Sequence, residues 1–106
     1  NLKILNKNDS STLILEAYYE IIKELITAIM SIDGYKTLSH ELLVSYLAKF
    51  YREFSKFEIN IIDQLRKTRN DIAYRGVMIN PEYLDRTENV IWEIIKKLRK
   101  IANSKL

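Results

Sequence analysis

The chain has 106 residues, of which 47% are hydrophobic and 29% charged, with a net charge of +3. These values predict one globular domain over residues 1–106 and exclude a disordered tail. The absence of cysteine excludes disulfides and thiolate metal sites and is typical of a cytoplasmic protein. No apolar run approaches the roughly 20 residues of a membrane span, so no membrane partner is expected. The chain begins with Asn and shows no signal-like segment, so we expect it to be a piece of a longer protein.

The first predicted helix ends at Gly34 and carries two apolar stripes. One stripe has the period of an amphipathic helix and is expected to face the core, after an N-cap within residues 9–11. A helix this apolar is either central in its domain or shared with a second chain, and we expect a two-fold homodimer. The expected core stripe is Ile14, Tyr18, Ile21, Leu25, Ala28 and Ile32. The second stripe is Leu15, Tyr19, Ile22, Ile26 and Met30, with Tyr19, Ile22 and Ile26 as expected dimer contacts.

Three further helices are predicted along the chain. The second covers about residues 39–52. The third begins at Ser55, whose spacing to Glu58 is that of a capping box, and ends at Gly76. The fourth opens at Asn80, which is followed by proline. This pattern predicts an all-α, antiparallel up-and-down four-helix bundle, with five helices as the alternative. The expected core positions are Leu42, Leu43, Tyr46, Leu47 and Phe50, then Ile59, Ile62, Leu65 and Ile72, then Leu84, Ile91, Ile94, Leu98 and Ile101.

The residue content excludes most familiar catalytic and metal sites. Two glycines cannot build a glycine-rich phosphate loop, and one histidine without cysteine does not suit a zinc or di-iron site. No metal or other cofactor is therefore expected. Ser39, His40 and Glu41 point in different directions on a helix, so they are better explained as a helix start than as a catalytic triad. For His40, a surface role and a role in a binding site both stay open.

The C-terminal end of the chain is basic, with no acid among its charged residues. Two explanations are open: these residues complement the dipole of the last helix, or they contact phosphate. The residues are Lys96, Lys97, Arg99, Lys100 and Lys105.

The third predicted helix carries a charge on its apolar seam. Between Leu65 and Ile72, the seam position is Arg69. Burying a guanidinium is unfavourable unless it is paired and hydrogen-bonded. Arg69 therefore either extends its charged end into water, pairs with an internal acid, or faces a cleft that holds an anion. The candidate internal acids are Asp63, Glu41 and Asp33.

The neighbours of Arg69 favour an anion-binding cleft. Basic residues outnumber acids in this stretch, where only Asp71 offsets them. Guanidinium groups donate two parallel hydrogen bonds and so suit phosphate. The expected nucleic-acid contacts are Arg66, Asn70, Arg75 and, from the second helix, His40.

The run LRKTRNDIAYRG at residues 65–76, together with the helix opening SHELL after DGYKTLS at residues 33–39, resembles the HEPN superfamily, especially its small archaeal members. The resemblance spans nearly the whole chain and implies a helical bundle, usually a homodimer. In active members, two copies of an arginine–histidine motif meet across the dimer and form a metal-independent endoribonuclease site. The arginine and histidine assist attack of an RNA 2′-hydroxyl on the adjacent phosphate.

Carried over by this resemblance, Arg69 is the motif arginine, Asn70 the polar residue after it, and Tyr74 stands where histidine is expected. Arg69 and Tyr74 are then the candidate catalytic residues. A phenol has a pKa of about 10 and is a poor base, so weakened or lost catalysis is implied. His40 is an alternative source of a base. Some members that pair with a minimal nucleotidyltransferase carry a tyrosine that accepts AMP, but Tyr74 is not at that position and is not assigned that role.

Three functional hypotheses follow. The first is a HEPN-like dimeric domain that binds RNA or nucleotide phosphate near Arg69 and Tyr74, with catalysis weakened or lost. The second is an active metal-independent endoribonuclease, the toxin of a toxin–antitoxin pair with a nucleotidyltransferase as partner. The third is a purely structural dimerisation domain in which an internal carboxylate neutralises Arg69.

Overall fold

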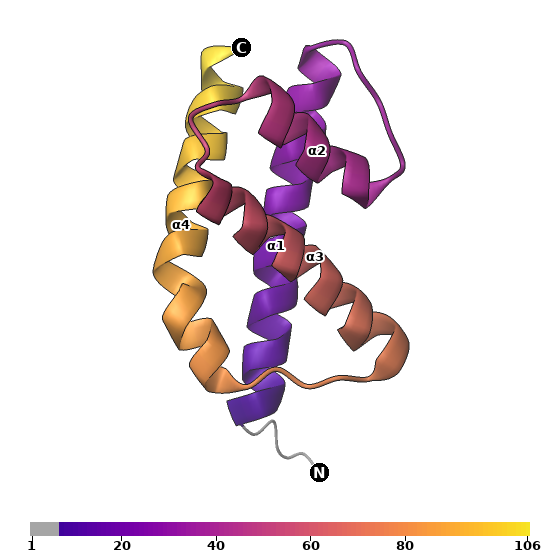
Figure 1. Cartoon of the computed structure of the whole chain (residues 1–106), viewed down its shortest axis with the longest axis vertical. Helices are drawn as coiled ribbons and strands as arrows, with labels where there is room; N and C mark the ends of the chain where they lie inside the picture. The colour runs from indigo at the N-terminus through magenta and orange to yellow at the C-terminus, as the bar shows by residue number, and fades with distance from the viewer. Residues whose placement is uncertain (1–6) are drawn as a thin grey trace.

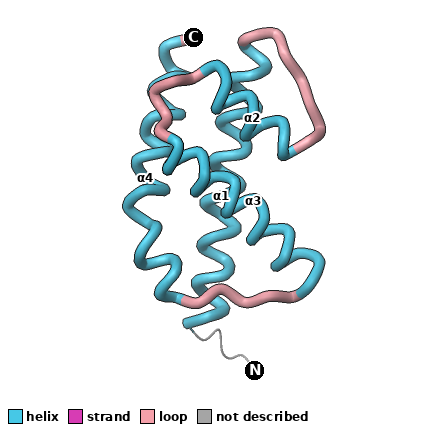
Figure 2. The backbone as a smooth tube through the Cα atoms, viewed as in Figure 1, coloured by secondary structure: helices cyan, strands magenta, loops and turns pink. Residues whose placement is uncertain are grey.

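The computed structural model describes residues 7–106, with side chains from Ser10 onward, and this part of the chain forms four helices and no strand (Figure 1). The predicted all-α four-helix bundle is confirmed, and the described residues form no fifth helix. Loops at residues 33–39, 51–55 and 76–80 join the helices (Figure 2). Within residues 7–106, no helix combines the length and apolar character that a membrane span requires. The helices are α1 (Lys7–Ile32), α2 (His40–Phe50), α3 (Lys56–Arg75) and α4 (Pro81–Ser104).

The predicted caps of α3 and α4 are confirmed. The side chain of Ser55 accepts a hydrogen bond from the backbone N–H of Glu58, and the Glu58 carboxylate accepts one from the backbone N–H of Ser55. Gly76 closes α3 with a φ of 67°, a left-handed conformation that suits a residue without Cβ. Asn80 caps α4 by accepting a backbone hydrogen bond of 2.9 Å. The expected cap of α1 at residues 9–11 is wrong, because α1 begins earlier and includes them.

The second apolar stripe of α1, and not the one expected to face the core, is the buried one, although Tyr18 of the expected core stripe is buried and Ile21 and Leu25 pack partly against the core. Tyr19, Ile22 and Ile26 are buried within the protomer, so they are core residues, and their prediction as dimer contacts is wrong. In the stripe expected to be core, Ile14 is 40% exposed and Ile32 is 46% exposed. The reason is packing: α1 contacts each of the other three helices, and the stripe that faces all three is the buried one.

The helices α1 and α4 lie side by side and run in the same direction (Figure 1). Near their starts, the hydroxyl of Thr12 accepts a 2.9 Å hydrogen bond from the backbone N–H of Ile79. Near their ends, the ammonium of Lys105 donates to the carboxylate of Asp33 at 2.6 Å. The Asp33 carboxylate also accepts hydrogen bonds from two tyrosines of the α2 region, which ties the end of α1 to α2 as well.

The connection between α1 and α2 makes the directions of the helices differ from the alternating up-and-down order that was expected. Residues 33–39 return along the bundle before α2 begins, so α2 runs with α1 and only α3 runs against them (Figure 1). Seven extended residues span at most roughly 23–25 Å, and an 11-residue helix is about 17 Å long. The connection is therefore long enough to reverse the chain. This reversal brings the start of α2, with His40, beside the C-terminal half of α3.

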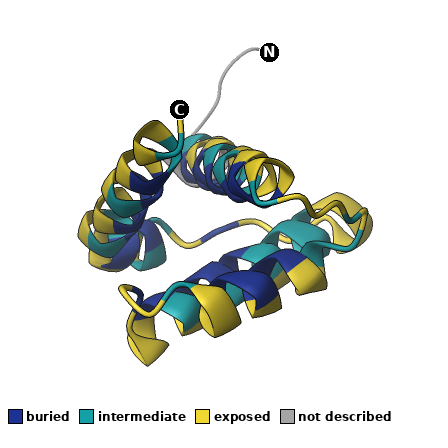
Figure 3. Ribbon diagram, turned by 90° about the horizontal axis from the view of Figure 1, so that it is seen from above, coloured by how far each residue is buried: buried dark blue, intermediate teal, exposed yellow. Residues whose placement is uncertain are grey.

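The hydrophobic core is shared by all four helices and ends part-way along α3. Figure 3 shows the buried positions on the faces that the helices turn toward one another. In α3, Ile61, Ile62 and Leu65 are buried, and no later residue of that helix is. The C-terminal half of α3 diverges from α1 and α4 (Figure 1). Arg69 is half-buried because the seam of α3 has left the core at that point.

The core prediction is confirmed for α4 and is partly wrong for α2. All the predicted seam residues of α4 are buried. On α2, Leu42 and Phe50 are exposed although they were expected in the core, and Val44 is buried instead. Because α2 packs on α1 and α3 through one face, side chains on its other face stay in solvent.

Candidate anion-binding cleft

The start of α2 and the C-terminal half of α3 form the two walls of a cleft with a volume of about 330 Å³. The structure brings five of the six predicted site residues together there. His40 lines the cleft from α2, and Arg66, Arg69, Asn70 and Tyr74 line it from α3. We call this site the anion cleft. Its residues come from two helices, and the returning α1–α2 connection is what makes them neighbours.

Arg75 lies outside the anion cleft. Its guanidinium is 3.7 Å from the carboxylate of Asp71, one turn earlier on α3, and both side chains are exposed. Tyr74, next to it in sequence, lines the cleft but is 82% exposed. A ligand that contacts Tyr74 therefore extends out of the cleft over the surface of α3.

Arg69 has no carboxylate within ion-pair distance among the side chains that the structure describes. Each of the three acids considered as its partner lies elsewhere. Asp33 pairs with a lysine at the end of α4, and Asp63 pairs with Arg66 at 3.0 Å. Glu41 lies 3.9 Å from Arg66. Arg69 therefore makes no ion pair among the described side chains. The acid that its charge does influence is Glu20, whose pKa is lowered mainly by Lys23 and in smaller part by Arg69.

Arg66 differs from Arg69 in being held by an acid. Its Nε donates a 3.0 Å hydrogen bond to Asp63, and its side chain is only 12% exposed. Burial raises the pKa of Asp63, but the hydrogen bonds from Arg66 and Lys67 outweigh this, and the pKa ends below its ordinary value. Asp63 is therefore ionised at neutral pH and offsets part of the positive charge of the cleft.

The surroundings of His40 favour its neutral imidazole. Burial, followed by the nearby positive charges of Lys23 and Arg69, lowers the pKa of His40 below its ordinary value, while Glu20 acts in the opposite direction. The ring lies 6.0 Å from that of Tyr19 on α1, at an angle of 50°. A neutral imidazole offers one hydrogen-bond donor and one acceptor, and it accepts a proton readily.

The basic C-terminal residues have mostly structural partners. Lys97 donates to both oxygens of Glu58, at 2.8 and 3.0 Å, and Lys105 pairs with Asp33. Lys96 lies 3.2 Å from Glu93. The contacts of Lys97 and Lys105 tie α4 to the start of α3 and the end of α1, whereas the Lys96 pair lies within α4. Two of the five basic residues therefore have a structural role between helices. Within the described residues, no group of three or more His, Cys, Asp or Glu side chains is arranged to hold a metal ion.

Sequence patterns did not single out two residues that border the site. Leu38 lines the anion cleft, and Lys23 of α1 influences the pKa of His40. Neither was assigned a role from the sequence, and His40 and Leu38 come close to Lys23 only through the path of residues 33–39. Comparison of the chain with family models, curated proteins and solved structures gave no match.

Proposed function

We propose that the anion cleft binds a phosphate of RNA or of a nucleotide, and that the protein is a HEPN-like binding domain with weak or no catalysis. The observation that carries this proposal is Arg69. Its guanidinium is half-buried in a cleft and lacks an acidic partner among the described side chains. A partly desolvated cation gains from an anionic partner, and a guanidinium fork fits phosphate oxygens.

Two neutral side chains support the same ligand. The amide of Asn70 and the hydroxyl of Tyr74 line the cleft beside Arg69, and both are typical contacts to phosphate and sugar oxygens. The pairing of Arg66 with Asp63 leaves little further free charge in the cleft. We therefore expect binding that depends on about one phosphate contact and responds weakly to salt.

The test compares two arginines of the same helix. Arg69→Leu should weaken binding of a labelled single-stranded oligoribonucleotide about tenfold and lower the salt slope by about one. Arg75→Leu removes the same charge outside the cleft and should change affinity by less than about twofold. Fluorescence anisotropy at several salt concentrations measures both. Equal losses would mean that general surface charge, and not the cleft, binds RNA. A loss of several kcal/mol in the stability of Arg69→Leu would favour the structural hypothesis instead.

A second function, metal-independent RNA cleavage, is favoured by one observation. His40 is neutral and lines the same cleft as Arg69, so a proton acceptor is present although Tyr74 replaces the motif histidine. General-base assistance contributes roughly 10²–10⁴-fold to a rate. Incubation with RNA and a chelator, followed by analysis for 2′,3′-cyclic phosphate ends, tests this. Cleavage that disappears in His40→Ala supports it, and loss in Tyr74→Phe would assign the base to the phenol.

We also propose that the protein is a homodimer. The proposed contact surface lies on α1 and α4 and differs from the one predicted from the sequence. On α1, Ile14 is exposed and Ile21 and Leu25 are half-buried. On α4, Trp92 is 42% exposed and packs edge-on against Tyr18 of α1, with ring centroids 5.5 Å apart. A two-fold axis would cover this apolar surface on both chains at once. Light scattering should give a dimer mass that Trp92→Glu reduces to a monomer; a monomeric parent protein would reject the dimer.

A further inference from the structure

A second pocket opens between α1 and the start of α2, with a volume of about 550 Å³. Small-molecule sites are typically clefts of roughly 300–1,000 Å³, so a pocket of this size accommodates a ligand larger than an ion. Leu38 and His40 line both this pocket and the anion cleft. The two spaces therefore meet at these side chains. We call the second pocket the α1–α2 groove.

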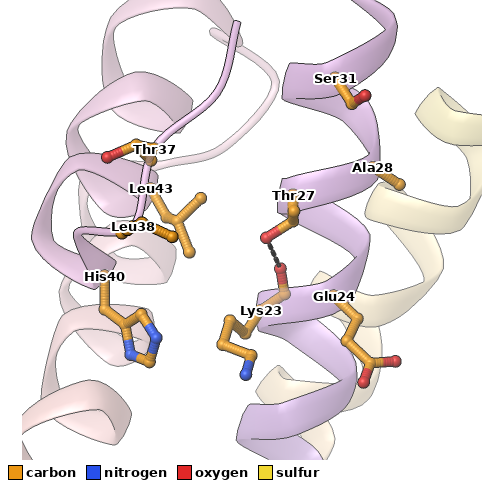
Figure 4. A pocket seen from close by; sticks show the side chains of 9 residues that line it. All are labelled: Lys23, Glu24, Thr27, Ala28, Ser31, Thr37, Leu38, His40 and Leu43. Atoms are coloured by element: carbon orange, nitrogen blue, oxygen red, sulfur yellow. Dashed lines mark hydrogen bonds between the residues drawn. The ribbon is translucent and has the colours of Figure 1, made fainter.

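The walls of the α1–α2 groove combine apolar and polar groups. In Figure 4, Thr27 and Lys23 of α1 face Leu43 and His40 of α2 across the groove. Leu43 is buried and forms an apolar surface beneath it, whereas Leu38 at its border is 100% exposed. The Thr27 hydroxyl donates to the backbone carbonyl of Lys23 at 2.8 Å, so its oxygen lone pairs remain for a further donor.

The charge at the border between the two spaces is moderate. The ammonium of Lys23 lies 2.8 Å from the carboxylate of Glu20, so it is already paired. Burial lowers the pKa of His40, which favours its neutral form. The free positive charge is thus on the Arg69 side. Because Glu24 also lines the groove, a second phosphate is disfavoured there, and the groove is suited to a neutral ligand moiety that has an apolar face and polar edges.

We propose that the α1–α2 groove receives the nucleobase of a nucleotide whose phosphate is bound at Arg69. This inference rests on the proposed function. A ligand that extends from the cleft into the groove must pass His40, and a base can stack on a histidine ring while its edges meet hydroxyl groups. The exposed side chain of Leu38 lies where such a base would cover it, which removes apolar surface from water. The groove then distinguishes nucleotides from other phosphates.

Three probes distinguish the contribution of the phosphate to binding from that of the base. They are inorganic phosphate, ribose 5-phosphate and AMP. Titration of the isotope-labelled protein, followed by amide chemical shifts, gives an affinity for each probe. AMP should bind about 5- to 150-fold more tightly than ribose 5-phosphate, the factor expected for one stacked base. Shifts caused only by AMP should lie on α1 and the α1–α2 connection, and shifts common to all three probes should lie on α3.

A pair of matched variants tests the groove directly. Thr27 is exposed on α1 and its side chain points into the groove (Figure 4), so Thr27→Phe should fill it. This change should reduce AMP affinity to that of ribose 5-phosphate and leave phosphate affinity unchanged. Asn89→Phe adds the same ring to an exposed position of α4 outside both spaces, and it should alter neither affinity. If Thr27→Phe does not fold, Leu38→Ser replaces it, since that side chain contributes no buried surface; AMP affinity should fall about threefold.

The outcomes distinguish the two proposals. If AMP and ribose 5-phosphate bind the parent protein equally, the groove inference is overturned while phosphate binding at Arg69 stands. Retention of the full AMP affinity in a folded Thr27→Phe protein also overturns it. If none of the three probes binds, both the proposed function and the groove inference fail.

Discussion

The two halves of α3 use charge in opposite ways. In the half that begins at Lys56 and ends at Leu65, the carboxylate of Glu58 is buried, caps its own helix and accepts two hydrogen bonds from Lys97. In the half that begins at Arg66, Arg69 is half-buried without an acidic partner among the described side chains. The first charge is satisfied within the protein; the second is not.

This difference follows from where the core ends. α3 packs against α1, α2 and α4, and its buried residues lie in its N-terminal half. A charged group there must find a partner inside the protein to offset its desolvation. Beyond Leu65 no residue of the helix is fully buried, and the seam position of Ile72 packs only partly against the core, so a charged residue is tolerated on the seam between them. A single helix can therefore stabilise the fold with one half and present a binding surface with the other.

The largest expected effect is a difference between the two halves of α3 in how much they contribute to stability. Leu65→Ala removes a fully buried side chain and should lower the free energy of unfolding by about 2–5 kcal/mol. Ile72→Ala, two turns further on in the half-buried seam, should lower it by about 1 kcal/mol or less. Urea unfolding followed by circular dichroism measures both. Equal losses would show that the C-terminal half of α3 is packed as tightly as the first.

A second pair of variants compares acids in the two halves. Glu58→Ala leaves Lys97 without its carboxylate partner and removes the carboxylate that accepts from the backbone N–H of Ser55 in the capping box, so it should lower the free energy of unfolding by about 2 kcal/mol. Asp71→Ala breaks only the exposed pair with Arg75, and the change should stay within about 0.5 kcal/mol. The same urea titration applies. A large loss in Asp71→Ala would contradict the view that the second half contributes little stability.

Removing the acidic partner of Arg66 should strengthen the binding of RNA in the cleft. Asp63→Asn removes the carboxylate that holds Arg66 and should increase the affinity for an oligoribonucleotide by about three- to tenfold, the value of one added charge contact. Arg66→Leu in the same background should remove the gain. Unchanged affinity in Asp63→Asn would mean that Arg66 does not reach the ligand.

The smallest expected effect is a pH dependence of binding. The pKa of His40 is lowered from its ordinary value of 6.5, mainly by burial and then by Lys23 and Arg69, so the imidazole gains its proton at a lower pH than a free histidine. A bound phosphodiester favours the protonated ring, and binding therefore takes up a proton. The affinity for the oligoribonucleotide should rise about two- to fivefold as pH falls below that value.

His40→Gln is the control for the pH effect. This variant keeps a polar side chain at the border of the two spaces but cannot titrate, so its affinity should not change over the same pH range. The charge of a phosphodiester is constant there, which leaves the imidazole as the titrating group in the cleft. A pH response that persists in His40→Gln would assign it elsewhere.

Local patterns in the sequence were sufficient to predict the helices, most of their ends and one anomaly. The capping box at Ser55, the glycine at residue 76 and the asparagine–proline pair at residue 80 act within a few residues, so the fold does not alter them. The seam of α4 was predicted correctly because that helix has a single apolar face. Arg69 stood out because it interrupts such a face.

Tertiary structure decided what these patterns leave open. Both stripes of α1 are apolar, and only packing against three helices determines that the stripe with Ile22 is buried. The direction of α2 depends on the path of residues 33–39, a connection long enough to run either way. That path brings His40 into the cleft with Arg69 and opens the groove beside it. Residues that are distant in sequence come together because all four helices must bury their apolar faces at the same time. No local pattern contains that information.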